Sequence, residues 1–285
     1  MGRAGAGPVA TVNGYGRFLN LLFPGDLYCL SCGRPLPGGQ FLRLTEPSGA
    51  GTATPAEAFR LCGYCFAELP WVQGRTCARC GKPLAPENPK PVCRDCAEAE
   101  HLFGQGYACV SYTGRAAELV RDLKYRERPY IADTLGGMMA RRFLEFADPE
   151  TGELPCYDFV CAAPMHARKR AARGFDQAEL LARGFARRSG LPYFPGLLAR
   201  IHETDVMSGL SRDKRLRNLS GEISLRSDAR AAGIAGKRAL IVDDIFTTGS
   251  TADACAEALL EGGAATADFF AFAIGADGRR AAASQ

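Results

Sequence analysis

The sequence has no apolar run that approaches the length of a membrane span, and residues 1–16 lack the continuous apolar segment of a secretory signal peptide. We therefore expect a cytoplasmic protein. The threonine-rich segment at 247–251 has no lysine followed by serine or threonine, and it lacks the three-glycine dinucleotide pattern. These absences count against a P-loop and against a dinucleotide-binding loop.

The composition sets only broad limits. A chain of 285 residues with 47% apolar residues can form one or two domains with substantial cores. The 35 lysine and arginine residues exceed the 31 aspartate and glutamate residues and give a net charge of +4. This mild excess permits contact with phosphates or nucleic acid without requiring it.

Eight of the 12 cysteines form four C-x-x-C pairs before residue 97, which indicates metal binding in a chain without a secretory signal. The sequence CLSCGRPL at 29–36 is echoed by CARCGKPL at 77–84, and a plainer pair follows each copy. The repeat predicts two structural zinc sites, each with four protein ligands. One would contain Cys29, Cys32, Cys62 and Cys65, and the other Cys77, Cys80, Cys93 and Cys96. A crossed arrangement, in which alternate pairs share a metal, is the alternative.

After residue 106, expected strands alternate with expected helices. Strands are predicted at 107–112, 159–163, 239–242 and 268–274, and helices at 116–125, 130–146, 176–188 and 252–261. This order predicts an α/β fold with a doubly wound parallel sheet, which binds ligands outside the carboxyl ends of its strands. Residues 18–23 are expected to form a short docking helix, and 45–55 a loop insertion.

The segment from Asp243 to Thr251 combines two acids with a hydroxyl-rich loop between the strand at 239–242 and the helix at 252–261. Such a loop directs backbone N–H groups and the positive end of the helix dipole at one point, where a phosphate fits. Where the strand ends the backbone turns, so we expect both Asp243 and Asp244 to face neighbouring hydroxyls of a ribose. A surface acidic turn before a capped helix is the alternative for the acids alone.

Two basic segments accompany this motif, HARKRAAR at 166–173 and RDKRLRN at 212–218. A ligand with several phosphate groups carries several negative charges and often Mg²⁺, so cationic loops on both sides of it make chemical sense. Solvated helix faces are the ordinary explanation of such charge runs.

Residues 243–251 resemble the phosphoribosyl pyrophosphate (PRPP) signature of type I phosphoribosyltransferases. The chain as a whole resembles the ComF-type competence proteins, which join a double zinc ribbon to a phosphoribosyltransferase domain. The resemblance rests on the cysteine knuckles and on the segments 123–125, 164–166, 173–178, 204–218 and 243–251. Asp176 stands where the family usually has Asn, and Met207 where Gln is common. We expect residues 1–103 to form an N-terminal helix and the zinc ribbons, and 104–285 the phosphoribosyltransferase-like domain.

The resemblance implies Mg²⁺-dependent transfer of a phosphoribosyl group from PRPP to an acceptor, with release of diphosphate. Asp243 and Asp244 are the implied catalytic residues, holding the ribose 2′ and 3′ hydroxyls. The implied substrate-binding residues are Thr247, Thr248, Gly249, Ser250, Thr251, Ala163, Pro164, Met165, His166, Arg168, Lys124, Arg212, Arg215 and Asn218.

The resemblance also implies a second hypothesis, a DNA-uptake factor of natural competence that binds single-stranded DNA or a helicase partner without turnover. The basic loops, interleaved with Phe175 and Phe185, are compatible with this role. A third hypothesis is a PRPP-sensing regulator, which would bind the ligand without turnover.

Overall fold

The computed structural model describes residues 27–36, 42–43, 58–126, 128–148, 150–201, 222–226 and 233–276. The helix expected at 18–23, the loop expected at 45–55 and the basic segment at 212–218 lie outside the described residues. Within the described part of the chain, no helix is both long enough and apolar enough to cross a membrane.

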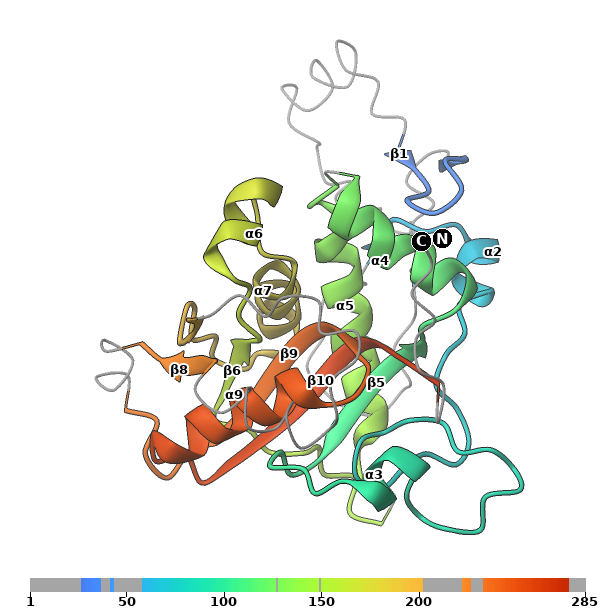
Figure 1. Ribbon diagram of the computed structural model, residues 1–285. Helices are drawn as coiled ribbons and strands as arrows, with labels where there is room; N and C mark the ends of the chain where they lie inside the picture. Colours follow the sequence, from blue (N-terminus) through green and yellow to red (C-terminus); the bar gives the residue numbers. More distant parts are fainter. Residues whose placement is uncertain are drawn as a thin grey trace, which may run out of the picture.

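A parallel sheet of four strands forms the centre of the molecule, in the order β5-β10-β9-β6 (Figure 1). Its strands are β5 (Gly106–Ser111), β6 (Phe159–Ala162), β9 (Arg238–Phe246) and β10 (Thr266–Ile274). The inner strand β9 pairs with both neighbours, so that Val242 lies beside Phe270 of β10 and Ala162 of β6. Nearly continuous apolar sequence in β9 and β10 is typical of parallel strands covered on both faces.

Helices cover both faces of this sheet, and the predicted doubly wound α/β architecture is confirmed. The helices α4 (Gly114–Tyr125), α5 (Ile131–Phe143) and α7 (Gln177–Ser189) pack on one face, and α9 (Ser250–Glu261) packs on the other (Figure 1). Alternate side chains of β9 divide between the two layers. Leu240 and Val242 join the core under α4, α5 and α7, whereas Ile241 joins the core under α9.

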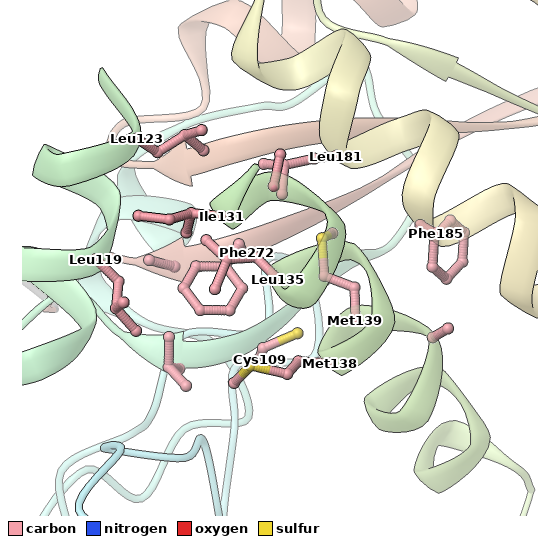
Figure 2. Packing of buried hydrophobic residues seen from close by; sticks show 14 of the residues in the cluster. Cys109, Leu119, Leu123, Ile131, Leu135, Met138, Met139, Leu181, Phe185 and Phe272 are labelled. Carbon is pink, nitrogen blue, oxygen red and sulfur yellow. The ribbon is translucent and has the colours of Figure 1, made fainter. Parts of the chain in front are cut away.

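The larger core lies between the sheet and the helices α4, α5 and α7. In Figure 2 its apolar side chains point toward one another from these helices and from β10; they include Leu119, Leu123, Leu135, Met139, Leu181, Phe185 and Phe272. Gly136 lets α5 approach α7 closely, because a methyl group added there would lie 2.9 Å from the backbone nitrogen of Phe185.

The cysteine-rich segment consists of short elements that pack against the same two cores. They are β1 (Leu27–Tyr28), β2 (Pro35–Leu36), β3 (Leu42–Arg43), β4 (Ala58–Phe59), α2 (Gly63–Ala67) and α3 (Arg94–Glu98). Leu30 and Leu61 belong to the α4–α5–α7 core, and Cys77 and Phe103 to the core under α9. Hydrophobic contacts therefore join the segments on both sides of residue 103. The division into two domains at that residue stays a prediction.

Some local structure differs from the sequence predictions. β9 continues to Phe246 rather than ending at Val242, because Ile245 and Phe246 are apolar and lie beside Ala273 and Ile274 of β10. The helix expected at 130–146 becomes α5 followed by the 3₁₀ turn η2 (Leu144–Phe146). The elements that were not predicted include the short ones of the cysteine-rich segment, α6 (Ala167–Arg173) and the antiparallel pair β7 (Leu198–Arg200) and β8 (Ile223–Leu225).

Candidate functional site

The four C-x-x-C pairs form two clusters of thiols. Metal site 1 contains Cys29, Cys32, Cys62 and Cys65, and metal site 2 contains Cys77, Cys80, Cys93 and Cys96; within each, the four Sγ atoms lie within 4.8 Å of one another. Two of the Sγ–Sγ distances are 3.9 Å, in metal site 1, and 3.7 Å, in metal site 2. Tetrahedral zinc with Zn–S bonds of about 2.3 Å requires about 3.8 Å between sulfurs. The predicted grouping is confirmed, and the crossed arrangement is wrong.

Backbone geometry prepares these thiols for zinc. In each metal site a cysteine caps a short helix, since Cys62 Sγ accepts from the N–H of Cys65 and Cys93 Sγ from that of Cys96, both at 3.5 Å. Burial raises the pKa of Cys29, but neighbouring backbone N–H donors outweigh burial and lower it to about 7. Zinc binds the thiolate form, so the lowered pKa of Cys29 favours the metal, whereas burial raises the pKa of Cys65 in the same site to about 12.

A small cavity lies at the carboxyl ends of β6 and β9, where open parallel sheets bind ligands. It is lined by Ala163, Ile241, Asp243, Ile245, Phe246, Thr247, Thr248, Gly249, Ser250, Thr251, Ala252 and Phe269. The Ala163 N–H donates to the Val242 carbonyl at 2.9 Å and so ties the segment after β6 to β9. The structure thus brings together Asp243, Ala163 and all five residues of the predicted phosphate loop, residues 247–251.

The phosphate loop leads directly into the first turn of α9. Gly249 is the residue before the helix, has a φ of 89°, and offers no side-chain cap to the first amides of α9. Thr247 and Thr248 are exposed, and Thr248 Oγ1 lies 3.0 Å from Ser250 Oγ. Uncapped amides at a helix N-terminus, surrounded by hydroxyl donors, favour an anion such as phosphate.

The side chains of Asp243 and Asp244 face opposite sides of the sheet. This corrects the expectation that both lie at the end of the strand and face the same ribose. They lie inside β9, where successive side chains alternate. Asp243 lines the cavity, whereas the buried Asp244 carboxylate forms an ion pair at 3.0 Å with Lys124 of α4. The two predicted site residues Asp244 and Lys124 therefore contact each other rather than the cavity. The Asp244 N–H donates to Asp243 Oδ1 at 2.7 Å.

These charges shift one another's protonation. Burial and then repulsion by Asp244 raise the pKa of Asp243 to about 8, although the Lys124 ammonium opposes the shift. Burial lowers the pKa of Lys124, but attraction by Asp244 and Asp243 outweighs it, so that its pKa is raised. Near neutral pH the carboxyl of Asp243 can therefore donate as well as accept hydrogen bonds.

The predicted site residues that directly follow Ala163 do not line the cavity. Pro164, Met165 and His166 are half-buried, and the Met165 N–H donates to Asp176 Oδ2 at 3.1 Å. Asp176 also caps α7 by accepting from the Glu179 N–H at 3.1 Å. Burial raises the pKa of Asp176 despite these donors.

The described basic residues that follow β6 lie on α6. His166 caps α6 through its Nδ1, which accepts from the N–H of the exposed Arg168 at 3.2 Å. Arg212, Arg215 and Asn218 lie outside the described residues. Phe185 is fully buried in the α4–α5–α7 core, so the idea that it interleaves with the basic loops is wrong.

Sequence reasoning missed two residues behind the phosphate loop. His101 Nδ1 lies 2.9 Å from Asp253 Oδ2, and Asp253 belongs to the first turn of α9. An acid in the first helical turn was a visible signal. Its partner was not, because 152 residues separate the two in the sequence.

Comparison with known proteins gives relatives for both parts of the chain. The double zinc ribbon domain family matches residues 51–97. DNA utilization protein YhgH of Salmonella typhi is 32% identical over 190 residues, which cover 67% of this chain and 80% of that protein. Competence protein F of Haemophilus influenzae is 24% identical over 203 residues, covering 71% and 79%. Competence protein ComFC of Bacillus subtilis is 26% identical over 213 residues, covering 72% and 80%.

Among solved structures, glutamine PRPP amidotransferase from B. subtilis complexed with ADP and GMP is 21% identical, covering 53% of this chain and 30% of that one, with a TM-score of 0.35. Purine phosphoribosyltransferase from Pyrococcus horikoshii is 16% identical, covering 50% and 73%, with a TM-score of 0.30. The 32% identity to the Salmonella protein over four fifths of its length, with the double zinc ribbon match, assigns the family. The chain belongs to the family that contains YhgH and the competence proteins F and ComFC.

Proposed function

We propose that the cavity binds PRPP with Mg²⁺ and that the protein transfers the phosphoribosyl group to an acceptor. One observation carries the proposal: the uncapped amides of α9, the hydroxyls of the phosphate loop and the Asp243 carboxyl line one cavity at the carboxyl end of the sheet. A phosphate and a polyhydroxylated sugar need these two kinds of partner side by side.

Each element has a separate role in this proposal. The phosphate loop binds the 5′-phosphate, and Asp243 binds a ribose hydroxyl. Asp244 acts from the other face of β9 by fixing negative charge next to Asp243, and its carboxylate pairs with Lys124 at 3.0 Å. The segment 163–166 and Arg168 receive the diphosphate, and the predicted roles of Arg212, Arg215 and Asn218 as further binding residues are retained. Bound Mg²⁺, which prefers oxygen ligands, would neutralise part of the diphosphate charge.

The chemistry requires no protein nucleophile. The bond between C1′ and the diphosphate oxygen breaks, and its electron pair leaves with the diphosphate. A lone pair of the acceptor forms the new bond at C1′, and the acceptor proton passes to solvent. C1′ becomes oxocarbenium-like during the exchange, so negative charge fixed at the Asp244 carboxylate stabilises the transition state.

Calorimetric titration of PRPP with Mg²⁺ tests the assignment. Asp243→Asn should weaken binding about fivefold, because it alters a hydrogen bond to a ribose hydroxyl that contributes about 1 kcal/mol. Asp158→Asn is the matched control, since Asp158 accepts from the Arg238 N–H at the opposite end of β9. Equal affinity in wild type and Asp243→Asn would reject the sugar assignment. Diphosphate release in a screen of nucleobase and amine acceptors then tests turnover, and retained affinity without release would favour the PRPP-sensing role.

A second function, binding of single-stranded DNA in DNA uptake, has support from the surface. Exposed tyrosines stack with arginines: the guanidinium of Arg173 lies 5.4 Å from the Tyr125 ring centroid, and that of Arg115 lies 5.3 Å from that of Tyr64. Tyr125 is 72% exposed. Unpaired bases stack on exposed aromatic rings and on guanidinium groups, while arginines neutralise phosphates.

Binding of a labelled oligonucleotide at several salt concentrations tests this second function. Tyr125→Ser should weaken binding about tenfold, the effect of losing one stacked base. Leu260→Ser, an exposed apolar residue on α9, is the control. Absence of binding at low salt, both alone and with a helicase partner, would reject it.

A further inference from the structure

We propose that metal site 2 supports the phosphate loop and that His101 is the positioning residue through which it does so. The inference deepens the proposed function and rests on it only where ligand affinity is concerned. It arises from side chains that join the second cysteine knuckle to the first turn of α9.

The strongest connection is the bond between His101 and Asp253. The His101 side chain is only 3% exposed, and its Nδ1 lies 2.9 Å from Asp253 Oδ2. The neighbouring Leu102 N–H donates to the other carboxylate oxygen at 2.8 Å. The segment that leaves metal site 2 thus engages both oxygens of an acid in the first turn of α9, and this fixes the helix end that the phosphate loop enters.

The imidazole ring of His101 also lies directly behind the loop backbone. A methyl group added at Gly249 would lie 2.8 Å from His101 Cε1 and 3.2 Å from the Phe246 ring. Gly249 has a φ of 89°, a conformation that glycine adopts without cost. His101 and Phe246 therefore form the surface against which this turn rests, and removing the ring would open space behind it.

The knuckle of metal site 2 holds His101 and Phe246 in place. Arg79, between Cys77 and Cys80, donates from Nη2 to the His101 carbonyl at 2.5 Å. Lys82 follows the same knuckle, is 2% exposed and forms an ion pair at 2.5 Å with Asp95, which lies between Cys93 and Cys96. The Lys82 ammonium lies 5.8 Å from the Phe246 ring centroid. Zinc in metal site 2 would fix both Lys82 and Asp95, because it joins the cysteine pair that precedes Lys82 to the cysteine pair that encloses Asp95.

Metal site 1 makes a different connection. Arg115 of α4 pairs with Glu68 at 2.8 Å and reaches Ser31 Oγ, which lies between Cys29 and Cys32, at 3.3 Å. This knuckle therefore supports α4 on the opposite face of the sheet from α9. The two metal sites should accordingly differ in their effect on the loop.

Hydrogen–deuterium exchange of the amides at 253–257, the first hydrogen-bonded amides of α9, tests the inference without any ligand. His101→Ala should accelerate their exchange about tenfold, the effect of losing one hydrogen bond to a charged group. His101→Asn should restore most of the protection, because its amide nitrogen can replace Nδ1 as the donor to Asp253. Arg115→Ala, the matched control at metal site 1, should leave these amides unchanged. Asp253→Asn supplies a second variant should His101→Ala lose its native circular dichroism.

The metal is tested by Cys96→Ser and Cys32→Ser, each of which removes one partly exposed ligand. With zinc content measured in both, only Cys96→Ser should accelerate exchange at 253–257 and weaken PRPP binding about tenfold. Equal exchange in wild type and His101→Ala would overturn the inference, as would equal acceleration by both cysteine variants. Failure of the wild type to bind PRPP would instead refute the proposed function, while the exchange result would still decide this inference.

Discussion

Replacing Lys124 by methionine should destabilise the fold strongly, because Lys124 balances a carboxylate that has little access to water. The Lys124 ammonium lies 3.0 Å from Asp244 Oδ2, and the Asp244 side chain is only 5% exposed. Asp244 lies on the face of β9 that Leu240 and Val242 share with the α4–α5–α7 core. Methionine keeps the length of the lysine side chain, so the substitution removes the charge and leaves the packing nearly intact.

The magnitude follows from the asymmetry of the pair. Removing one partner of a buried ion pair costs about 3–5 kcal/mol, because the other charge stays buried without compensation. Lys124 is 20% exposed and water reaches its ammonium, so we expect the lower end, about 3 kcal/mol. Asp244→Asn should cost less, about 1–2 kcal/mol, because Lys124 can turn toward solvent. In the double variant the two effects should overlap, with a coupling energy of about 2 kcal/mol.

Urea unfolding followed by circular dichroism, with zinc present throughout, measures these free energies. In a chain of this size, 3 kcal/mol corresponds to a drop in Tm of roughly 6–12 °C. Arg126→Met is the matched control from the same helix, since Arg126 pairs with Asp122 while 70% exposed, and it should cost less than about 1 kcal/mol. If Lys124→Met costs no more than Arg126→Met, or if the double-mutant coupling energy is zero, Lys124 does not compensate the buried charge of Asp244.

Three further predictions follow from the site and from the helix contacts. The pKa of Asp243 rises from 3.8 to about 8 on folding, so the contribution of this carboxyl to stability is fully present below about pH 4 and is lost as the pH rises toward 8. Asparagine does not ionise, so the Tm of Asp243→Asn relative to wild type should increase over that pH interval in ligand-free thermal scans. Gly249→Ala should cost about 1–3 kcal/mol in urea unfolding, because φ is 89° and the new methyl group meets His101 at 2.8 Å; a neutral result would refute the close contact. Gly136→Ala should destabilise by about 1–3 kcal/mol because the α7 backbone blocks it, whereas Gly184→Ala, with its nearest contact at 3.5 Å, should be neutral or stabilising in the same assay.

The features that the sequence predicts correctly are those encoded by nearby residues. The two copies of the cysteine knuckle each end in a glycine with positive φ, at Gly33 and Gly81, and the repeat pairs the right cysteines because each copy is a complete unit. The strand, loop and helix from 238 to 261 likewise follow from an apolar run, a hydroxyl-rich turn and a helix-forming segment in direct succession. Local pattern and local physics agree in both places.

The features that sequence reasoning misses depend on contacts between distant segments. The strand β9 extends beyond its apolar run at 239–242 because β10 pairs with it as far as Phe246. Nothing near Asp244 predicts that Lys124, 120 residues earlier, will neutralise it. The hairpin of β7 and β8 is equally non-local, since its strands contain only three residues each and gain stability from pairing and burial.

The two adjacent acids of β9, Asp243 and Asp244, differ in what explains their burial. A carboxylate inside a parallel sheet is costly, and a structural explanation must supply a compensating partner. For Asp244 that partner is Lys124, so its burial is explained by the fold itself. Asp243 is different, because the fold raises its pKa to about 8 and places it against the cavity and the phosphate loop. A perturbed acid that costs stability and lines a cavity is a functional-site candidate on physical grounds. Asp243 is therefore the acid that we expect to contact a ligand, whereas Asp244 and Lys124 are the charged pair beside it.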